Sequence, residues 1–348
     1  MMTRPLWAER PFIVIWEVTR ACELACRHCR AEANARRDPR ELKAGEVPGF
    51  LDQVARAAPK VFVLTGGDPM MREDLLDIIS GATGRGLTVS LSPSATPRFL
   101  EADLRRFRDA GLKRVSLSLD GAGAETHDAF RGVPGTWDRT MEAVVAARDA
   151  GIEVQINTTF TRQNLCEFDA FVALLGEIKP SLWSVFQLVP TGRAKASDLL
   201  TALEMEMLFE RLAELSLRVP YPVKTTEGQH FRRVLLQQWK RLPGLPRPQI
   251  LPVNDGNGFV FVSHTGDIQP SGFLPVTAGN VRREELLEVY QNSPLFRELR
   301  DPALLKGKCA RCEFRTLCGG SRARAYGLTG DWLAEEPLCL YQPPALVA

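Results

Sequence analysis

The chain has 348 residues, of which 45% are hydrophobic, and its 44 basic and 42 acidic side chains give a formal net charge of +2. This composition supports a soluble globular protein with one large and one smaller domain, and it gives no electrostatic argument for nucleic-acid binding. The sequence contains no run of about 18 apolar residues and no signal peptide, so we expect a cytoplasmic protein without a membrane segment.

Apolar runs alternate with helical patterns through the first 217 residues. Six runs are predicted strands, at residues 12–16, 60–64, 87–91, 114–119, 152–156 and 182–186. Between the third and fourth, Thr96 is expected to cap one helix that starts with Pro97 and ends near Gly111. Alternating strands and helices imply right-handed crossovers and a parallel sheet. We therefore predict an α/β fold with a partial (β/α)6 barrel of the TIM type, or alternatively a doubly wound open sheet.

Three cysteines follow the first predicted strand at C-x3-C-x2-C spacing, namely Cys22, Cys26 and Cys29. Thiolates suit iron–sulfur clusters and zinc, and a compact loop with three of them can bind three corners of a cubane. The fourth iron would then keep an open position for a small molecule. The alternatives are unrelated core cysteines or a structural zinc site, although zinc usually takes four protein ligands and the next cysteine pair begins only at residue 309.

Small and polar residues end three of the predicted strands: Gly66, Gly67 and Asp68 after the second, Ser118 and Asp120 at the fourth, and Asn157 at the fifth. Glycines let the backbone approach a ligand closely, and a neighbouring carboxylate or carbonyl can accept hydrogen bonds from an ammonium group. Ligands of parallel barrels bind at the carboxyl ends of the strands. We therefore expect these residues near the cysteine loop, with ordinary strand-terminating turns as the alternative.

The alternation breaks at about residue 218, where prolines bracket a helix-like piece at residues 231–239. We predict a barrel domain at residues 1–217, a bridge at 218–257 and a small α+β domain at 258–348 that opens with a β-hairpin. Within the bridge, Glu227, His230, Arg232 and Arg233 are candidates for binding a carboxylated substrate, or else a solvated helix start.

A second cysteine array lies near the C-terminus and consists of Cys309, Cys312, Cys318 and Cys339. Four thiols can complete a closed site, and their spacing fits zinc and a four-iron cluster about equally well. The remaining cysteine, Cys166, is expected to be a small buried hydrophobe without a role.

The segment from Trp16 to Cys29 resembles the signature of radical S-adenosylmethionine (radical SAM) enzymes. In that family, three cysteines hold a [4Fe-4S] cluster whose unique iron chelates the methionine moiety of S-adenosylmethionine. An electron from the reduced cluster, supplied by a donor such as flavodoxin or ferredoxin, cleaves the sulfonium. The resulting 5′-deoxyadenosyl radical takes a hydrogen atom from the substrate. The resemblance implies that Cys22, Cys26 and Cys29 hold the catalytic cluster.

The same resemblance implies contacts to S-adenosylmethionine. The Gly66-Gly67-Asp68 turn is similar to the family's Gly-Gly-Glu motif, which holds the amino group, with Asp68 in place of the usual Glu. The strand end at Ser118 and Asp120 matches the contacts to the ribose and the methionine carboxylate, and Asn157 would be a further polar contact.

The C-terminal cysteines resemble the auxiliary-cluster set of the SPASM or twitch extension of radical SAM enzymes, which implies a second [4Fe-4S] cluster on Cys309, Cys312, Cys318 and Cys339. Ser271 and Ser321 stand where the full SPASM pattern often has cysteine, so a further auxiliary cluster is expected to be absent.

Residues 309–341 and the Thr225-Thr226-Glu227 segment are most similar to the branch of the family that acts in heme and heme d1 biosynthesis. This similarity implies a tetrapyrrole substrate whose propionate-type side chain is lost or oxidised. One alternative is modification of a ribosomally made peptide, as in other SPASM enzymes. A second is a non-catalytic iron–sulfur electron carrier, which would not need the polar strand ends at Asp68 and Asp120.

Overall fold

The computed structural model describes residues 7–242, 244 and 246–344, so the outermost residues of the first and third predicted domains lie outside the described residues. One ten-stranded sheet runs through the described chain, in the order β10-β9-β8-β1-β2-β3-β4-β5-β6-β7. Its strands are β1 (Ile13–Thr19), β2 (Val61–Gly66), β3 (Val89–Leu91), β4 (Arg114–Ser118), β5 (Glu153–Phe160), β6 (Leu182–Gln187), β7 (Val223–Thr226), β8 (Phe259–Val262), β9 (Asp267–Gln269) and β10 (Gly279–Asn280).

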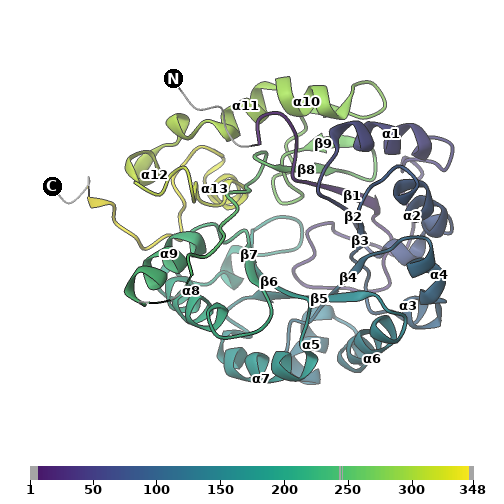
Figure 1. Cartoon of the computed structure of the whole chain (residues 1–348), viewed down its shortest axis with the longest axis horizontal. Helices are drawn as coiled ribbons and strands as arrows, with labels where there is room; N and C mark the ends of the chain where they lie inside the picture. Colours follow the sequence, from purple (N-terminus) through teal and green to yellow (C-terminus); the bar gives the residue numbers. More distant parts are fainter. Residues whose placement is uncertain (1–6, 243, 245, 345–348) are drawn as a thin grey trace.

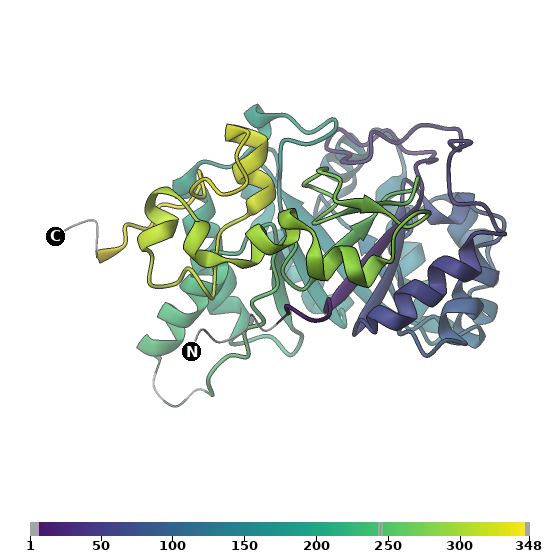
Figure 2. The same cartoon turned by 90° about the horizontal axis from the view of Figure 1, so that it is seen from above.

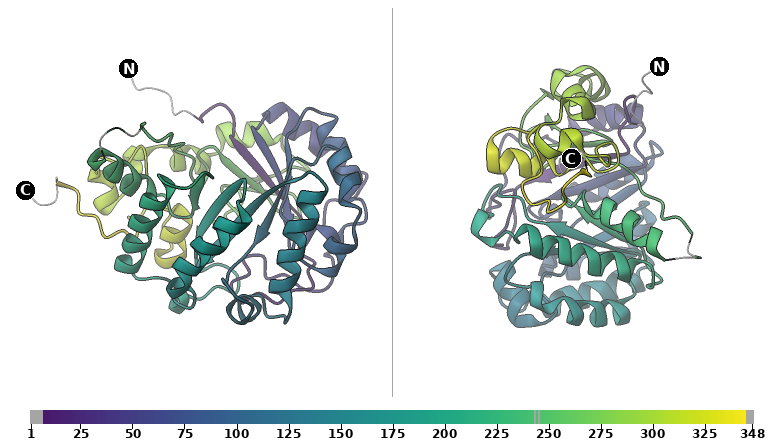
Figure 3. Two further views of the ribbon diagram at one scale, coloured as in Figure 1. Left: turned by 60° about the horizontal axis from the view of Figure 1, so that its bottom comes forward. Right: turned by 90° about the vertical axis from the view of Figure 1, so that its left-hand side faces the viewer.

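Helices cover the outside of the curved sheet and form the C-terminal segment (Figures 1 and 3). They are α1 (Val47–Ala57), α2 (Leu75–Thr83), α3 (Pro97–Glu101), α4 (Leu104–Asp109), α5 (Ala124–Arg131), α6 (Thr136–Asp149), α7 (Phe168–Ile178), α8 (Ala202–Ser216), α9 (Phe231–Arg241), α10 (Leu286–Asn292), α11 (Pro294–Arg300), α12 (Gly307–Arg311) and α13 (Arg322–Thr329).

The predicted α/β fold is confirmed. Strands β1 to β7 pair in parallel with their neighbours in chain order, and each of the six predicted strands corresponds to one of β1 to β6. In the order of the sheet β7 is the last strand, and β8 pairs in parallel with β1 on the other side. The result is a partial barrel whose sheet ends at β7 on one side and, beyond β8 and β9, at β10 on the other.

The strands of the barrel bury one face against the helices and turn the other toward the interior. In β1, Val14, Trp16 and Val18 are completely buried, whereas Ile13 and Ile15 line an internal cavity. This difference follows from the two-residue period of a β-strand. The outer face therefore supplies the core, and the inner face is left to line the site.

The segment at residues 218–257, predicted as a bridge, contributes to the sheet as well. Its strand β7 pairs with β6, and its helix α9 covers the predicted helix-like piece at residues 231–239. The predicted hairpin after residue 258 is present as β8 and β9, which pair antiparallel. In Figure 2 the C-terminal helices lie at one end of the molecule and α2 to α4 at the other. The division into three domains stays a prediction.

The prediction of one helix between Thr96 and Gly111 is wrong in one respect, because the chain forms two short helices there. Helix α3 ends at Glu101, and Asp103 caps α4 by accepting a hydrogen bond from the Arg105 amide. Thr96 makes no capping hydrogen bond; its hydroxyl donates instead to Asp68, at 2.9 Å. A contact with a residue 28 positions away has replaced the local cap.

Candidate active site

A cavity of about 550 Å³ occupies the interior of the partial barrel. The inward-facing residues of β1 to β8 form its walls, and the loop after β1 forms one end. This volume is in the range typical of pockets for small molecules and cofactors. The three N-terminal cysteines, Gly66, Gly67, Ser118 and Asn157 all line it. The fold thus brings most of the predicted site residues together around one space.

The three cysteines of the loop have the surroundings expected of cluster ligands. The Leu24 amide donates to Cys22 Sγ at 3.3 Å, and the Ala33 amide donates to Cys29 Sγ at 3.5 Å. Hydrogen bonds of this kind to ligand sulfurs tune iron–sulfur clusters. The thiols are not in disulfides, and burial raises the pKa of Cys22 to about 11. A metal that binds there must therefore displace a firmly held proton.

Arg131 is a site residue that the sequence did not reveal. It ends α5, lines the cavity, donates to Cys26 Sγ at 3.7 Å and forms an ion pair with Asp120. A charged loop residue is usually solvated, so the sequence offered no reason to select it. Its helix crosses behind the cysteine loop, and the guanidinium thereby joins that loop to the end of β4.

Gly66 and Gly67 bring the end of β2 against the start of the cysteine loop. A Cβ atom on Gly66 would lie 2.4 Å from the Thr19 carbonyl oxygen, and one on Gly67 would lie 2.5 Å from that of Ala21. The Gly67 amide donates to the Thr19 carbonyl at 2.8 Å. Only glycine allows this approach, so the two positions fix the cysteine loop relative to the cavity.

The Asp68 carboxylate does not line the cavity. It is completely buried and accepts hydrogen bonds from the Met70 amide, the Ser94 amide and the Thr96 hydroxyl, at 3.1, 3.3 and 2.9 Å. Burial raises its pKa to about 6 despite these donors. The carboxylate predicted to hold an amino group instead connects the loops after β2 and β3.

Of the other predicted strand-end residues, Ser118 and Asn157 face the cavity as register partners on β4 and β5. Asp120 is buried outside the cavity lining, where it accepts from the Thr159 amide at 2.7 Å and pairs with Arg131. His127 also lines the cavity, and its Nδ1 accepts from the Asp120 amide at 3.1 Å.

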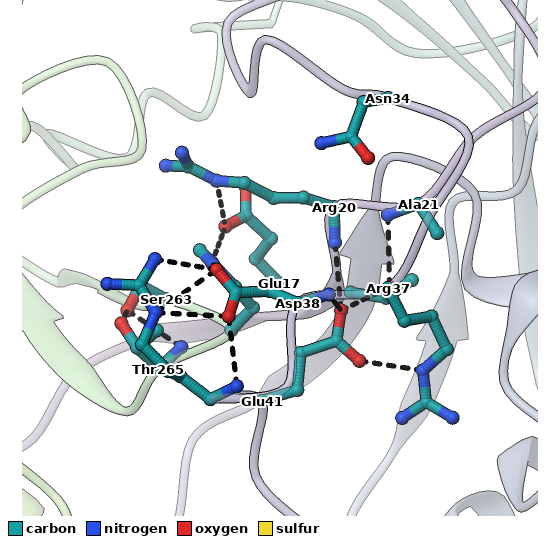
Figure 4. Close-up of polar contacts among 12 residues, drawn as sticks. Glu17, Arg20, Ala21, Asn34, Arg37, Asp38, Glu41, Ser263 and Thr265 are labelled. Atoms are coloured by element: carbon teal, nitrogen blue, oxygen red, sulfur yellow. Dashed lines mark hydrogen bonds and ion pairs between the residues drawn. The ribbon is translucent and has the colours of Figure 1, made fainter.

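Glu17 anchors the cysteine loop through a network of polar contacts (Figure 4). Its carboxylate lies 3.2 Å from Arg20 Nε, 3.0 Å from Arg30 Nη1 and 2.8 Å from His264 Nδ1. Burial alone would raise the pKa of Glu17, but Arg30 and the other two partners outweigh it and hold the pKa near 2. Close by, Glu41 accepts from the Thr19 hydroxyl at 2.5 Å.

The C-terminal cysteines Cys309, Cys312, Cys318 and Cys339 line a second, smaller cavity. The Glu336 amide donates to Cys309 Sγ and the Gly320 amide to Cys318 Sγ, both at 3.4 Å. Burial raises the pKa of Cys318 to about 12 and that of Cys339 to about 11. Cys166 is exposed and lines neither cavity, so its predicted burial is wrong.

Within the described residues, no three His, Cys, Asp or Glu side chains converge closely enough to hold a single metal ion. A four-iron cluster does not require its ligands to converge on one ion, because each cysteine binds a different iron.

Ser271 and Ser321, which replace cysteines of the full SPASM pattern, converge on Glu227. Both hydroxyls donate to its carboxyl group, and Glu227 also lines the large cavity. Burial, and then the neighbouring Asp255, raise the pKa of Glu227 well above its usual value. A carboxyl group with a raised pKa and two hydroxyls thus occupy this position.

The remaining candidates in the predicted bridge have other partners. Arg232 donates to the carbonyls of Val253 and Leu317, and Arg233 pairs with Glu206 at 2.5 Å. His230 is buried against Phe209 and, with Arg233, lines the smaller cavity. Of these four residues, only Glu227 lines the large cavity.

Comparison with known proteins supports the same interpretation. The family model for the radical SAM superfamily matches residues 16–175. The AdoMet-dependent heme synthase of Oleidesulfovibrio alaskensis is 41% identical over 344 residues, covering 95% of this chain and 87% of that protein. The AdoMet-dependent heme synthase of Methanosarcina barkeri is 39% identical and covers 96% of this chain and 97% of its own.

Among solved structures, SuiB of Streptococcus suis superposes with a TM-score of 0.73 at 17% identity, covering 96% of this chain and 78% of SuiB. At this identity the likeness establishes the fold alone.

Within the described residues, no helix is both long enough and apolar enough to cross a membrane. The relatives and the family model together show that the chain belongs to the radical SAM superfamily, as an enzyme of the kind that carries a [4Fe-4S] cluster and binds S-adenosylmethionine.

Proposed function

We propose that this enzyme abstracts a hydrogen atom from a tetrapyrrole side chain, in a reaction of heme or heme d1 biosynthesis that removes or oxidises a propionate-type group. The observation that carries the proposal is the alignment of two AdoMet-dependent heme synthases, at 41% and 39% identity, along nearly the whole chain. The lining of the cavity supports it, because Phe186, Phe259, Phe261 and Phe273 provide flat apolar surface beside basic side chains. A tetrapyrrole combines a flat apolar ring with carboxylates at its edge.

We assign the catalytic [4Fe-4S] cluster to Cys22, Cys26 and Cys29. Together with S-adenosylmethionine it would supply the 5′-deoxyadenosyl radical. The amides of Leu24 and Ala33 and the Arg131 guanidinium would stabilise the negative charge on the ligand sulfurs.

Gly66, Gly67, Ser118 and Asn157 are the proposed direct contacts to S-adenosylmethionine, because they line the cavity beside the cysteines. Asp68 and Asp120 belong to the same predicted set, yet both carboxylates are buried in hydrogen bonds that connect loops and strand ends. We infer that they contribute by fixing the walls of the cavity.

We assign a second [4Fe-4S] cluster to Cys309, Cys312, Cys318 and Cys339 in the C-terminal segment, residues 258–348, which would act as an auxiliary-cluster domain beside the barrel of residues 1–217. With four cysteine ligands such a cluster has no open iron, so it suits electron transfer or structural support. A flavodoxin or ferredoxin would supply the electron for the catalytic cluster.

A ribosomal peptide is the alternative substrate. The supporting observation is the fold shared with SuiB, a protein whose structure is also known with its precursor peptide bound. The low identity to SuiB makes this the weaker proposal, because the heme synthases are much more similar in sequence.

The test is anaerobic reconstitution with iron and sulfide, reduction, and addition of S-adenosylmethionine with an iron coproporphyrin or a siroheme derivative. We expect 5′-deoxyadenosine and a tetrapyrrole product whose mass has changed at a propionate. Turnover of a peptide but of no tetrapyrrole would favour the alternative substrate. Failure to form any 5′-deoxyadenosine would contradict catalysis and leave the role of an iron–sulfur electron carrier.

A further inference from the structure

Lys224 is a cation of the cavity wall with no counter-charge. It is the second residue of β7, where it pairs in register with Ser184 of β6, and its side chain lines the large cavity. Among the described residues, no carboxylate forms an ion pair with it and no hydrogen bond of its ammonium group is found. Lys224 is itself exposed. Desolvation by the surrounding chain, and then the nearby Arg114, lower its pKa to about 8.

The other cations that line the cavity all have partners within the protein. Arg30 pairs with Glu17, Arg114 with Glu153 and Arg131 with Asp120, whereas Arg193 donates to the carbonyls of Cys26 and Ala33. Among the described residues, the only acidic one in the lining is Glu227, and burial and the neighbouring Asp255 raise its pKa well above the usual value. Within the described chain, Lys224 is therefore the lining cation with neither an ion pair nor a hydrogen bond to the protein, whereas Arg193 lacks an ion pair but donates to two carbonyls.

The surroundings of Lys224 indicate what kind of anion this is. Aromatic side chains line the same cavity: Phe186 lies on β6, paired with Thr226 two residues after Lys224, and Phe259 and Phe261 lie on β8. A flat apolar group with a carboxylate at its edge would place the ring against these side chains and the carboxylate at the ammonium.

The proposed S-adenosylmethionine contacts lie on other strands. Ser118 is on β4, three strands away from β7, or about 14 Å along the sheet at the usual strand spacing. Gly66 and Gly67, at the end of β2, are further away in the order of the sheet. Asn157, on β5, is the proposed contact nearest to β7 in the sheet, two strands away. Lys224 and the proposed S-adenosylmethionine contacts thus lie on different strands of the cavity wall.

We propose that Lys224 binds a carboxylate of the substrate and orients its ring along the aromatic wall between β6 and β8. This inference rests on the proposed function, because the substrate it describes is a tetrapyrrole with free propionates. The same ammonium chemistry would suit the methionine carboxylate of S-adenosylmethionine, so the experiment has to separate the two sources.

The test compares Lys224→Met, which keeps the length of the side chain but removes its charge, with Lys224→Arg, which keeps the charge. Lys60→Met is the matched control, because Lys60 is exposed and does not line the cavity. Each reconstituted protein is titrated, by visible absorbance, with iron coproporphyrin and with its fully esterified form. Binding of S-adenosylmethionine is measured separately by equilibrium dialysis.

We expect Lys224→Met to weaken binding of the free acid roughly 10- to 100-fold, the usual value of a charge-assisted hydrogen bond, and to leave binding of the ester unchanged. Lys224→Arg should retain most of the affinity, and Lys60→Met all of it. Equal affinity of Lys224→Met and wild type for the free acid would overturn the inference. So would a loss confined to S-adenosylmethionine. A wild-type protein that binds no tetrapyrrole would overturn the proposed function itself and this inference with it.

Discussion

Glu17 of β1 and His264, in the turn between β8 and β9, lie 2.8 Å apart although 247 residues separate them in the sequence. Glu17 also pairs with Arg30, whose guanidinium lies over the Phe261 ring of β8 at 4.6 Å. One buried carboxylate thus joins the cysteine loop to the C-terminal hairpin. The loop that is proposed to hold the catalytic cluster therefore depends on contacts with the C-terminal part of the chain.

Replacing Glu17 by Gln should destabilise the protein and its cysteine loop together. The substitution leaves two arginines without their buried partner, and loss of one member of a buried ion pair typically costs about 3–5 kcal/mol. We expect a lower free energy of unfolding in denaturant titrations and less iron bound after reconstitution. Glu73→Gln is the control, because Glu73 is exposed at the surface. A variant as stable as wild type would show that the network contributes no net stability.

Local patterns predicted the parts of the site that depend on local sequence. The cysteine spacing and the polar strand ends lie within short segments, and strand alternation places Cys22, Gly67 and Ser118 at the same end of the barrel. The β-strand period also separates the buried Trp16 from the cavity-lining Ile15.

Contacts between distant segments could not be predicted in this way. Arg131 reaches Cys26 across 105 residues, and His264 reaches Glu17 across 247. Thr96 has the sequence context of a helix cap, but its hydroxyl donates to the buried Asp68 carboxylate and makes no capping hydrogen bond. The sequence likewise drew attention to Arg232 and Arg233 as carboxylate binders, whereas Lys224 is the lining cation of the described chain with neither an ion pair nor a hydrogen bond.

The two cysteine arrays should lose iron independently. We expect Cys318→Ala to bind about four irons per chain where wild type binds about eight, and still to form 5′-deoxyadenosine, because the catalytic cluster remains. Cys26→Ala should also retain about four irons but form no 5′-deoxyadenosine. Cys166→Ala, at an exposed position, should match wild type in both measurements. If Cys318→Ala keeps its full iron content, the C-terminal array does not hold a cluster.

Tetrapyrrole binding should weaken at alkaline pH through Lys224. Its pKa is about 8 without ligand, and only the protonated form attracts a carboxylate, so affinity should fall as the pH rises through 8. Arg114, and Glu227 with its raised pKa, are further charged or titratable groups that line this cavity. Between pH 7 and pH 9 we expect roughly a tenfold loss for wild type, since each pH unit above the pKa costs up to tenfold. Lys224→Arg and Lys224→Met should show no such change, and parallel profiles in all three proteins would assign the effect elsewhere.

Asp68→Asn separates the structural and ligand-binding roles of this carboxyl group. Because burial raises the folded-state pKa to about 6 from the usual 3.8, ionisation of Asp68 lowers stability as the pH rises through 6. The variant lacks this loss, so its stability relative to wild type should increase by about 1 kcal/mol between pH 5 and pH 8, measured by denaturant unfolding.

The affinity of the same variant for S-adenosylmethionine should stay within about twofold of wild type, because the carboxylate faces Ser94 and Thr96 and not the cavity. Glu101→Gln, at an exposed position ending α3, serves as the control for both measurements. Binding weakened about tenfold or more would instead mean that Asp68 turns toward the cavity to hold the amino group, as the family's Gly-Gly-Glu motif does. An unchanged affinity with the expected pH dependence would identify Asp68 as the group that fixes the loops after β2 and β3 beside the cysteines.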